Sequence, residues 1–73
     1  MYIFTISHEQ KDYDCNIAHV IVADLTEEVR ELAKSKSQAE GTDIWDKAPI
    51  KKIGEYTGKK TYSHIVLTNC LHG

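Results

Sequence analysis

The chain has 73 residues, of which 41% are hydrophobic and 27% charged, and its formal net charge is −2. This composition excludes an intrinsically disordered protein, which needs fewer apolar residues and more net charge. The longest apolar run is far shorter than the roughly 20 residues of a membrane-spanning helix. We therefore expect one globular domain, residues 1–73, with a single small core.

The N-terminal segment and the cysteines indicate the compartment. The chain begins Met-Tyr-Ile-Phe, with no basic leader and no small-residue cleavage site, so no secretory signal is visible. Two cysteines, Cys15 and Cys70, are too few for a secreted disulfide scaffold of this size. We expect reduced thiols and a cytoplasmic location. A small domain without disulfide bonds is marginally stable. The protein could therefore form a homodimer or bind a partner that completes its core.

The charges are divided unevenly along the chain. Residues 1–46 carry ten acids and four bases, whereas residues 47–73 carry five lysines and one acid. The acids complement the dipole of a predicted helix, and the lysines are typical of a protected edge strand. A surface for a charged partner is the alternative interpretation. So small a basic set does not support direct, sequence-specific nucleic acid binding.

Two strands are predicted first. Residues 2–8 alternate, with Tyr2, Phe4, Ile6 and His8 on one side, which is typical of a half-buried strand. The polar residues 9–14 predict a loop or hairpin connection. Residues 15–23 are largely apolar on both faces, so this second strand is expected inside the sheet.

A helix is predicted next, over residues 25–39. Asp24 and Glu27 have the spacing of a capping box, with Asp24 as N-cap and Glu27 at the third helical position. Gly41 is the expected stop. One apolar stripe runs along this helix: Leu25, Val29, Leu32 and Ala33.

The remaining third predicts a short helical turn and two more strands. Residues 42–46 form the turn, which would pin Trp45 over the core, and Pro49 ends it. Residues 50–57 read as a strand with broken alternation, which predicts a bulge near Gly54. Residues 57–60 predict a hairpin turn. Residues 62–69 predict the last strand, with Ile65 and Leu67 on one face and Tyr62, His64 and Val66 on the other.

The predicted order is therefore β-β-α-β-β, an α+β fold with one helix on a mainly antiparallel four-stranded sheet. The sequence leaves the strand order open. One face of such a sheet lacks a second layer, so apolar or aromatic residues on it predict an interface. The candidates for this interface are Tyr2, Tyr56 and Tyr62.

This layout resembles small β-β-α-β-β proteins of phages and other mobile elements, a group without assigned catalytic residues. The resemblance covers about two thirds of the chain, and its motifs are short. Asn69-Cys70 departs from it, because a Ser-Phe step is expected there. It implies a phage origin and a small factor against host defences. The matching pieces are Ala23-Asp24, residues 27–33, residues 53–58, and Ile65-Val66-Leu67 with Gly73.

No pattern in the sequence predicts catalysis. Gly54 and Gly58-Lys59-Lys60-Thr61 superficially resemble a phosphate-binding loop, but the glycines are one residue too close and a strand follows instead of a helix. No local turn marks a nucleophilic cysteine. The acid pairs at residues 12 and 14 and at residues 43 and 46 lie in polar segments, which favours solvated carboxylates.

A metal site is conceivable only if the first and last segments meet. Cys70 and His72 are two residues apart, and no second close pair of ligands exists. Cys15 and His19 could supply the remaining ligands. Core thiols and surface histidines are the favoured interpretation, so we assign no metal and no cofactor. The candidate ligands are His8, Cys15, His19, His64, Cys70 and His72.

The sequence therefore favours a non-enzymatic interaction module that occupies a surface of a larger host protein or protein–nucleic-acid complex, as an anti-CRISPR-like inhibitor would. Trp45 is either a lid on the core or a contact residue in an interface. The alternative function is a small-ligand or nucleotide-binding module that forms its pocket as an oligomer. The predicted partner-binding residues are Glu27, Glu28, Glu31, Trp45, Tyr56 and Tyr62.

Overall fold

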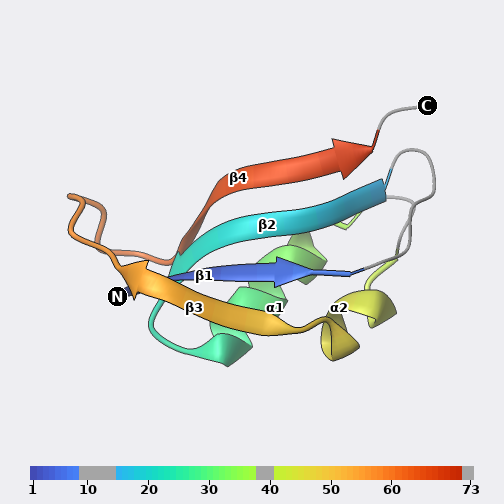
Figure 1. The fold of residues 1–73 in the computed structure, drawn as a ribbon, viewed down its shortest axis with the longest axis horizontal. Coiled ribbons are helices and arrows are strands. Elements are labelled where there is room, and N and C mark those ends of the chain that lie inside the picture. The colour runs from blue at the N-terminus through green and yellow to red at the C-terminus, as the bar shows by residue number, and fades with distance from the viewer. Residues whose placement is uncertain (9–14, 38–40, 72–73) are drawn as a thin grey trace.

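A computed structural model describes residues 1–8, 15–37 and 41–71, and of Cys15, Cys70 and Leu71 it describes the backbone alone. Figure 1 shows its fold. The predicted strands and both helices are present. In chain order they are β1 (Tyr2–Ser7), β2 (Cys15–Ala23), α1 (Thr26–Ser35), α2 (Asp43–Lys47), β3 (Ile50–Glu55) and β4 (His64–Leu71).

The four strands form one antiparallel sheet with the order β3-β1-β2-β4, which confirms the α+β prediction. β1 and β2 occupy the centre, and both helices lie against one face (Figure 1). The predicted hairpin turn at residues 57–60 is wrong, because β3 and β4 lie on opposite edges of the sheet. Residues 56–63 instead carry the chain from one edge to the other at the end of the sheet (Figure 1).

Three bulges interrupt the strand pairings: one leaves Ile17 of β2 without a partner residue in β4, and the other two lie in the edge strands and set which of their side chains share a face. One interrupts the β1–β3 pairing, where Phe4 lies opposite Lys52 and Ile3 opposite Gly54, so that Ile53 is the extra residue. This confirms the bulge predicted near Gly54. The other lies in β4 at Val66, between the pairs of Ile21 with Ile65 and of Val20 with Leu67. It corrects the predicted faces of the last strand, because Ile65 and Leu67 lie on opposite faces.

Helix α1 is shorter than predicted and begins one residue later. Leu25 is the N-cap residue, and its apolar side chain makes no capping hydrogen bond to the helix. Glu28, not Glu27, occupies the third helical position and accepts the N–H groups of Asp24 and Leu25 at 3.2 Å each. The predicted cap at Asp24 is therefore wrong by one position. The first turn still carries the acids that a helix N-terminus favours.

The C-terminal end of α1 lies at Ser35, before the predicted stop. The N–H of Lys36 bonds to Ala33 O, and the carbonyl of Lys36 accepts the Nδ2 group of Asn16 at 2.6 Å. This bond from a buried β2 side chain satisfies a carbonyl that the helix would otherwise leave free. Gly41 does not end α1; it has a φ of +77° and lies just ahead of α2.

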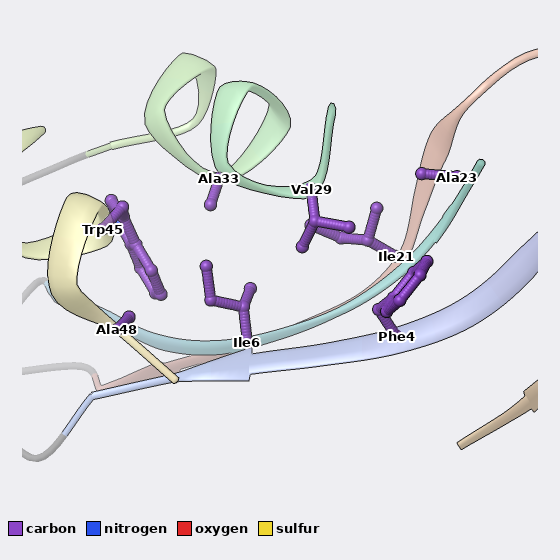
Figure 2. Close-up of a cluster of buried hydrophobic side chains, with 8 residues drawn as sticks. All are labelled: Phe4, Ile6, Ile21, Ala23, Val29, Ala33, Trp45 and Ala48. Carbon is purple, nitrogen blue, oxygen red and sulfur yellow. The ribbon is translucent and has the colours of Figure 1, made fainter. Parts of the chain in front are cut away.

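The core fills the space between the sheet and the two helices (Figure 2). Ile6 and Ile21 project from the central strands toward Val29 and Ala33 of α1 (Figure 2). Trp45 closes one end of this layer from α2, as the predicted helical turn requires. Neither helix of the described chain is long and apolar enough to cross a membrane. The core cluster is Phe4, Ile6, Ile21, Ala23, Val29, Ala33, Trp45 and Ala48.

Candidate interaction surface

The strand pairings place one set of side chains on the sheet face opposite α1 and α2, which we call the open face. Partners in a sheet share a face, so Lys51, Thr5, Val20 and Leu67 form a row across all four strands. No described helix or strand covers this face (Figure 1). Its other members are Ile3, Ser7, Ala18, Val22, Gly54, His64 and Asn69.

The open face is more apolar than a sheet face that contacts only water usually is. A solvated sheet face is typically polar, but Ile3 and Val20 are half-buried there and Leu67 is 63% exposed. Lys51 is the one charged side chain of the open face as defined above, and it lies on the edge strand β3. Exposed apolar side chains beside polar ones on an uncovered surface are typical of protein interfaces.

An aromatic group closes one end of the open face. The His64 ring lies between the rings of Tyr56 and Tyr62, with centroid distances of 5.4 and 5.7 Å. Nδ1 of His64 donates to the Tyr62 carbonyl at 2.9 Å. Val22 is fully buried in the same row as His64, although no described helix lies over it, and we infer that the His64 ring shields it.

Gly58 allows this arrangement because the Tyr56 ring folds back over it. A Cβ atom at Gly58 would collide with the hydroxyl end of that ring. The Tyr56 hydroxyl accepts the N–H of Lys60 at 3.3 Å, which holds the turn against the ring. Two of the predicted contact residues, Tyr56 and Tyr62, therefore do come together, and Tyr62 remains 60% exposed.

The third tyrosine proposed for this face is elsewhere. Tyr2 lies in the same alternation as Phe4 and Ile6, so it faces the helix side, where it packs against the core cluster. The Lys52 ammonium lies 4.4 Å above its ring. Tyr2 is thus removed from the open face, which is a correction to the sequence-based prediction.

Trp45 is buried, not presented to a partner. Its exposed fraction is 0%, and the rings of His8 and His19 lie 4.8 and 4.9 Å from its own. His8 donates from Nε2 to the Asn16 carbonyl at 2.6 Å, and Nδ1 of His19 lies 2.9 Å from Thr68 Oγ1. Of the two interpretations of Trp45, the structure supports the lid on the core, so the residue does not belong to the interaction surface.

The three acidic residues predicted for a partner do not form one free surface. Glu27 and Glu31 are exposed on α1. Glu28 is half-buried, and its Oε2 atom accepts the Ser63 hydroxyl at 2.9 Å. Glu28 therefore caps α1 and ties it to the segment that precedes β4. Of these three acids, Glu27 and Glu31 are the two that remain exposed.

The environment of Glu28 predicts a pH-dependent effect on stability. The Ser63 hydroxyl, followed by the backbone N–H groups of Leu25 and Asp24, lowers the pKa of this carboxyl below its ordinary value of 4.5. A lowered pKa in the folded state stabilises the protein above the unfolded pKa, and this contribution is lost as the pH falls through the folded pKa. We expect Glu28→Gln to destabilise the protein at pH 7 and to differ little from wild type at pH 2–3.

The measurement is urea unfolding at both pH values, with Glu27→Gln as the matched control. Glu27 is an exposed neighbour on the same helix. We expect its substitution to leave the pH dependence of unfolding as in wild type. An equal change in both variants would show that Glu28 has no special role at the helix N-terminus.

An open pocket of about 400 Å³ lies beside α2. Its polar side chains are those of Ser7, His8 and Lys47, and Ile44, Ala48 and Pro49 complete it. The pocket adjoins the open face at Ser7, which belongs to both, whereas His8 lies on the helix side against Trp45. It falls within the usual size range of small-molecule sites, roughly 300–1,000 Å³.

The residues that the structure describes contain no cluster of potential metal ligands. No three His, Cys, Asp or Glu side chains come together there. The strands that carry Cys15 and Cys70 do pair, with Cys15 opposite Leu71 and Asn16 opposite Cys70. The two cysteine side chains and His72 lie outside the described part of the chain.

Comparisons of the chain with protein-family models, with curated proteins and with solved structures found no match.

Proposed function

We propose that this protein is a non-enzymatic interaction module that binds a larger protein through its open face. The observation that supports this function is the apolar surface of the uncovered sheet face, which Ile3 and Val20 supply on the central strands and Leu67 on the edge strand β4. Binding would bury this apolar surface and exclude water from it, while Lys51 and Tyr62 lie at its margin. The mechanism is steric, because the partner loses access to the surface that the sheet covers.

The resemblance to small phage proteins supports a narrower proposal about the partner. We propose that it is a protein, or protein–nucleic-acid complex, of the host cell's defence system and that the complex forms in the host cytoplasm. The exposed acids Glu27 and Glu31 lie on the helix side, away from the open face, and we assign them a secondary role. They add negative charge that would favour encounter with a basic partner surface.

The test uses one substitution at two places on the chain. Thr5 lies on the central strand β1 in the middle of the open face, whereas Thr26 is exposed at the start of α1. We expect Thr5→Glu to abolish capture of a stoichiometric host partner by the tagged protein, because it buries an unpaired charge in the interface. We expect Thr26→Glu to leave capture unchanged.

Circular dichroism of both variants controls for folding. If Thr5→Glu does not fold, Ser7→Glu replaces it, because Ser7 is exposed on the same face of β1. Loss of capture in the Thr26 variant, or full capture by a folded open-face variant, would contradict the proposal. Mass spectrometry of the captured protein tests the narrower proposal about host defence.

The pocket beside α2 favours one alternative, a small-ligand or nucleotide-binding module. His8 and Lys47 could contact an anionic group at its mouth, with Ile44 as an apolar wall. This function predicts that a nucleotide raises the melting temperature of the purified protein and that Lys47→Ala removes the rise. A captured protein partner with no such thermal shift would favour the interaction module.

A further inference from the structure

The two edges of the sheet differ in how they are protected from pairing with another chain. β3 is the shorter edge strand, follows directly after Pro49 and carries Lys51 and Lys52. It also contains the bulge at Ile53. Short length, proline, lysine and bulges are the features by which natural proteins prevent edge-to-edge pairing. The β3 edge therefore carries all four protections.

The β4 edge carries only one of them. Its eight residues, His-Ile-Val-Leu-Thr-Asn-Cys-Leu, include no aspartate, glutamate, lysine or arginine. Within the described chain β4 pairs with β2 alone, and its outer edge meets no described segment (Figure 1). Val66 and Leu67 are 57% and 63% exposed. The bulge at Val66 is the protective feature of β4 itself, and beyond it Leu67, Thr68 and Asn69 pair with β2 in regular register. The next irregularity of this pairing lies in β2, at Ile17.

We propose that β4 pairs antiparallel with β4 of a second copy of this chain, which joins the two four-stranded sheets into one. An antiparallel pair of identical strands is related by a two-fold axis, which is the commonest symmetry of soluble oligomers. The charges favour a second copy on this edge. Pairing β4 with itself brings no like charges together, whereas pairing β3 with itself would oppose lysines.

The pairing also enlarges the open face. Leu67 of each copy would lie near the new two-fold axis, so the central rows of the two open faces would continue into one another. A small domain gains stability in this way without a larger core of its own. The inference does not rest on the proposed function, because it concerns the backbone edge of β4 and not the centre of the face.

The experiment places the same charge on each edge. Val66 and Ile53 are branched, exposed residues at the bulges of the two edge strands. We expect size-exclusion chromatography with light scattering to give twice the 8.3 kDa chain mass for wild type and for Ile53→Lys. We expect Val66→Lys to run as a monomer, with the dissociation constant of the dimer raised about tenfold or more. Circular dichroism checks that each variant folds.

If Val66→Lys does not fold, Asn69→Lys takes its place, because Asn69 is exposed on the same strand. A monomeric wild type up to millimolar concentration would overturn the inference. So would a dimer that survives the folded β4 variant, or one that Ile53→Lys disrupts equally. The proposed function fails separately, because Thr5→Glu on the central strand tests capture of a partner and does not touch the β4 edge.

Discussion

Replacement of Trp45 by alanine is expected to lower the free energy of unfolding by about 3–5 kcal/mol, which is the usual range for a buried aromatic residue. Trp45 is fully buried at the end of a core whose other members include three alanines. The cavity would lie between α2 and the imidazole rings of His8 and His19. In a domain this small, such a loss is comparable to the whole stability, so the variant is expected to be largely unfolded.

Urea unfolding followed by circular dichroism measures this loss, and Tyr62→Ala is the matched control. Tyr62 is also aromatic but is 60% exposed, so its truncation is expected to change stability by less than about 0.5 kcal/mol. Trp45→Phe keeps most of the buried area and is expected to fold. If Trp45→Ala were as stable as Tyr62→Ala, Trp45 would not be the lid on the core. That result would favour the other interpretation, in which Trp45 is a contact residue of an interface.

The sequence was sufficient for the elements and for their fold class, because both follow from local periodicity. The alternation of β1, the apolar run of β2 and the proline after α2 each act on their own segment. Alternation also places Tyr2 beside Phe4 and Ile6, so its removal from the open face follows from the sequence pattern itself. The burial of Trp45 was likewise one of the two interpretations that its position allowed.

The arrangement of the edges could not be predicted in the same way. The Thr57-Gly58-Lys59-Lys60 segment has the composition of a hairpin turn, but a local turn signal does not say which strands pair. The connection of residues 56–63 is long enough to cross the end of the sheet, and Tyr56 and His64 then meet across it. Strand order is a tertiary property that the turn does not encode.

An uncovered sheet face follows from the predicted layers, but the sequence does not assign Leu67 to it, for a similar reason. Leu67 is exposed because the bulge at Val66 moves it to the face opposite Ile65, and no glycine or proline in β4 marks that bulge. The bulge at Ile53 was predictable, since Gly54 follows a break in the alternation. The acidic residues of α1 were recognised by charge alone, which cannot distinguish the capping role of Glu28 from the exposure of Glu31.

Arg30 holds α2 in place, and its substitution by methionine is expected to lower the free energy of unfolding by about 2–3 kcal/mol. One guanidinium nitrogen donates to the carbonyls of Trp45 and Ala48 at 2.7 and 2.8 Å. Both carbonyls lie at the C-terminal end of a five-residue helix, where no intrahelical donor reaches them. Without the Arg30 guanidinium, both carbonyls lose their charged hydrogen-bond donor, and the backbone of Trp45 loses the contact that holds it in place.

Lys34→Met is the control, because Lys34 lies one turn further along α1 and also reaches α2. Its ammonium pairs with Asp46, and this partner raises the pKa of the lysine. The pair is partly exposed, so its contribution is small and is screened by salt. We expect urea unfolding to show a much larger loss for Arg30→Met, at low and at high salt alike. Equal losses, or a loss at Arg30 that salt removes, would show that α2 is held by surface charge and not by the two carbonyl bonds.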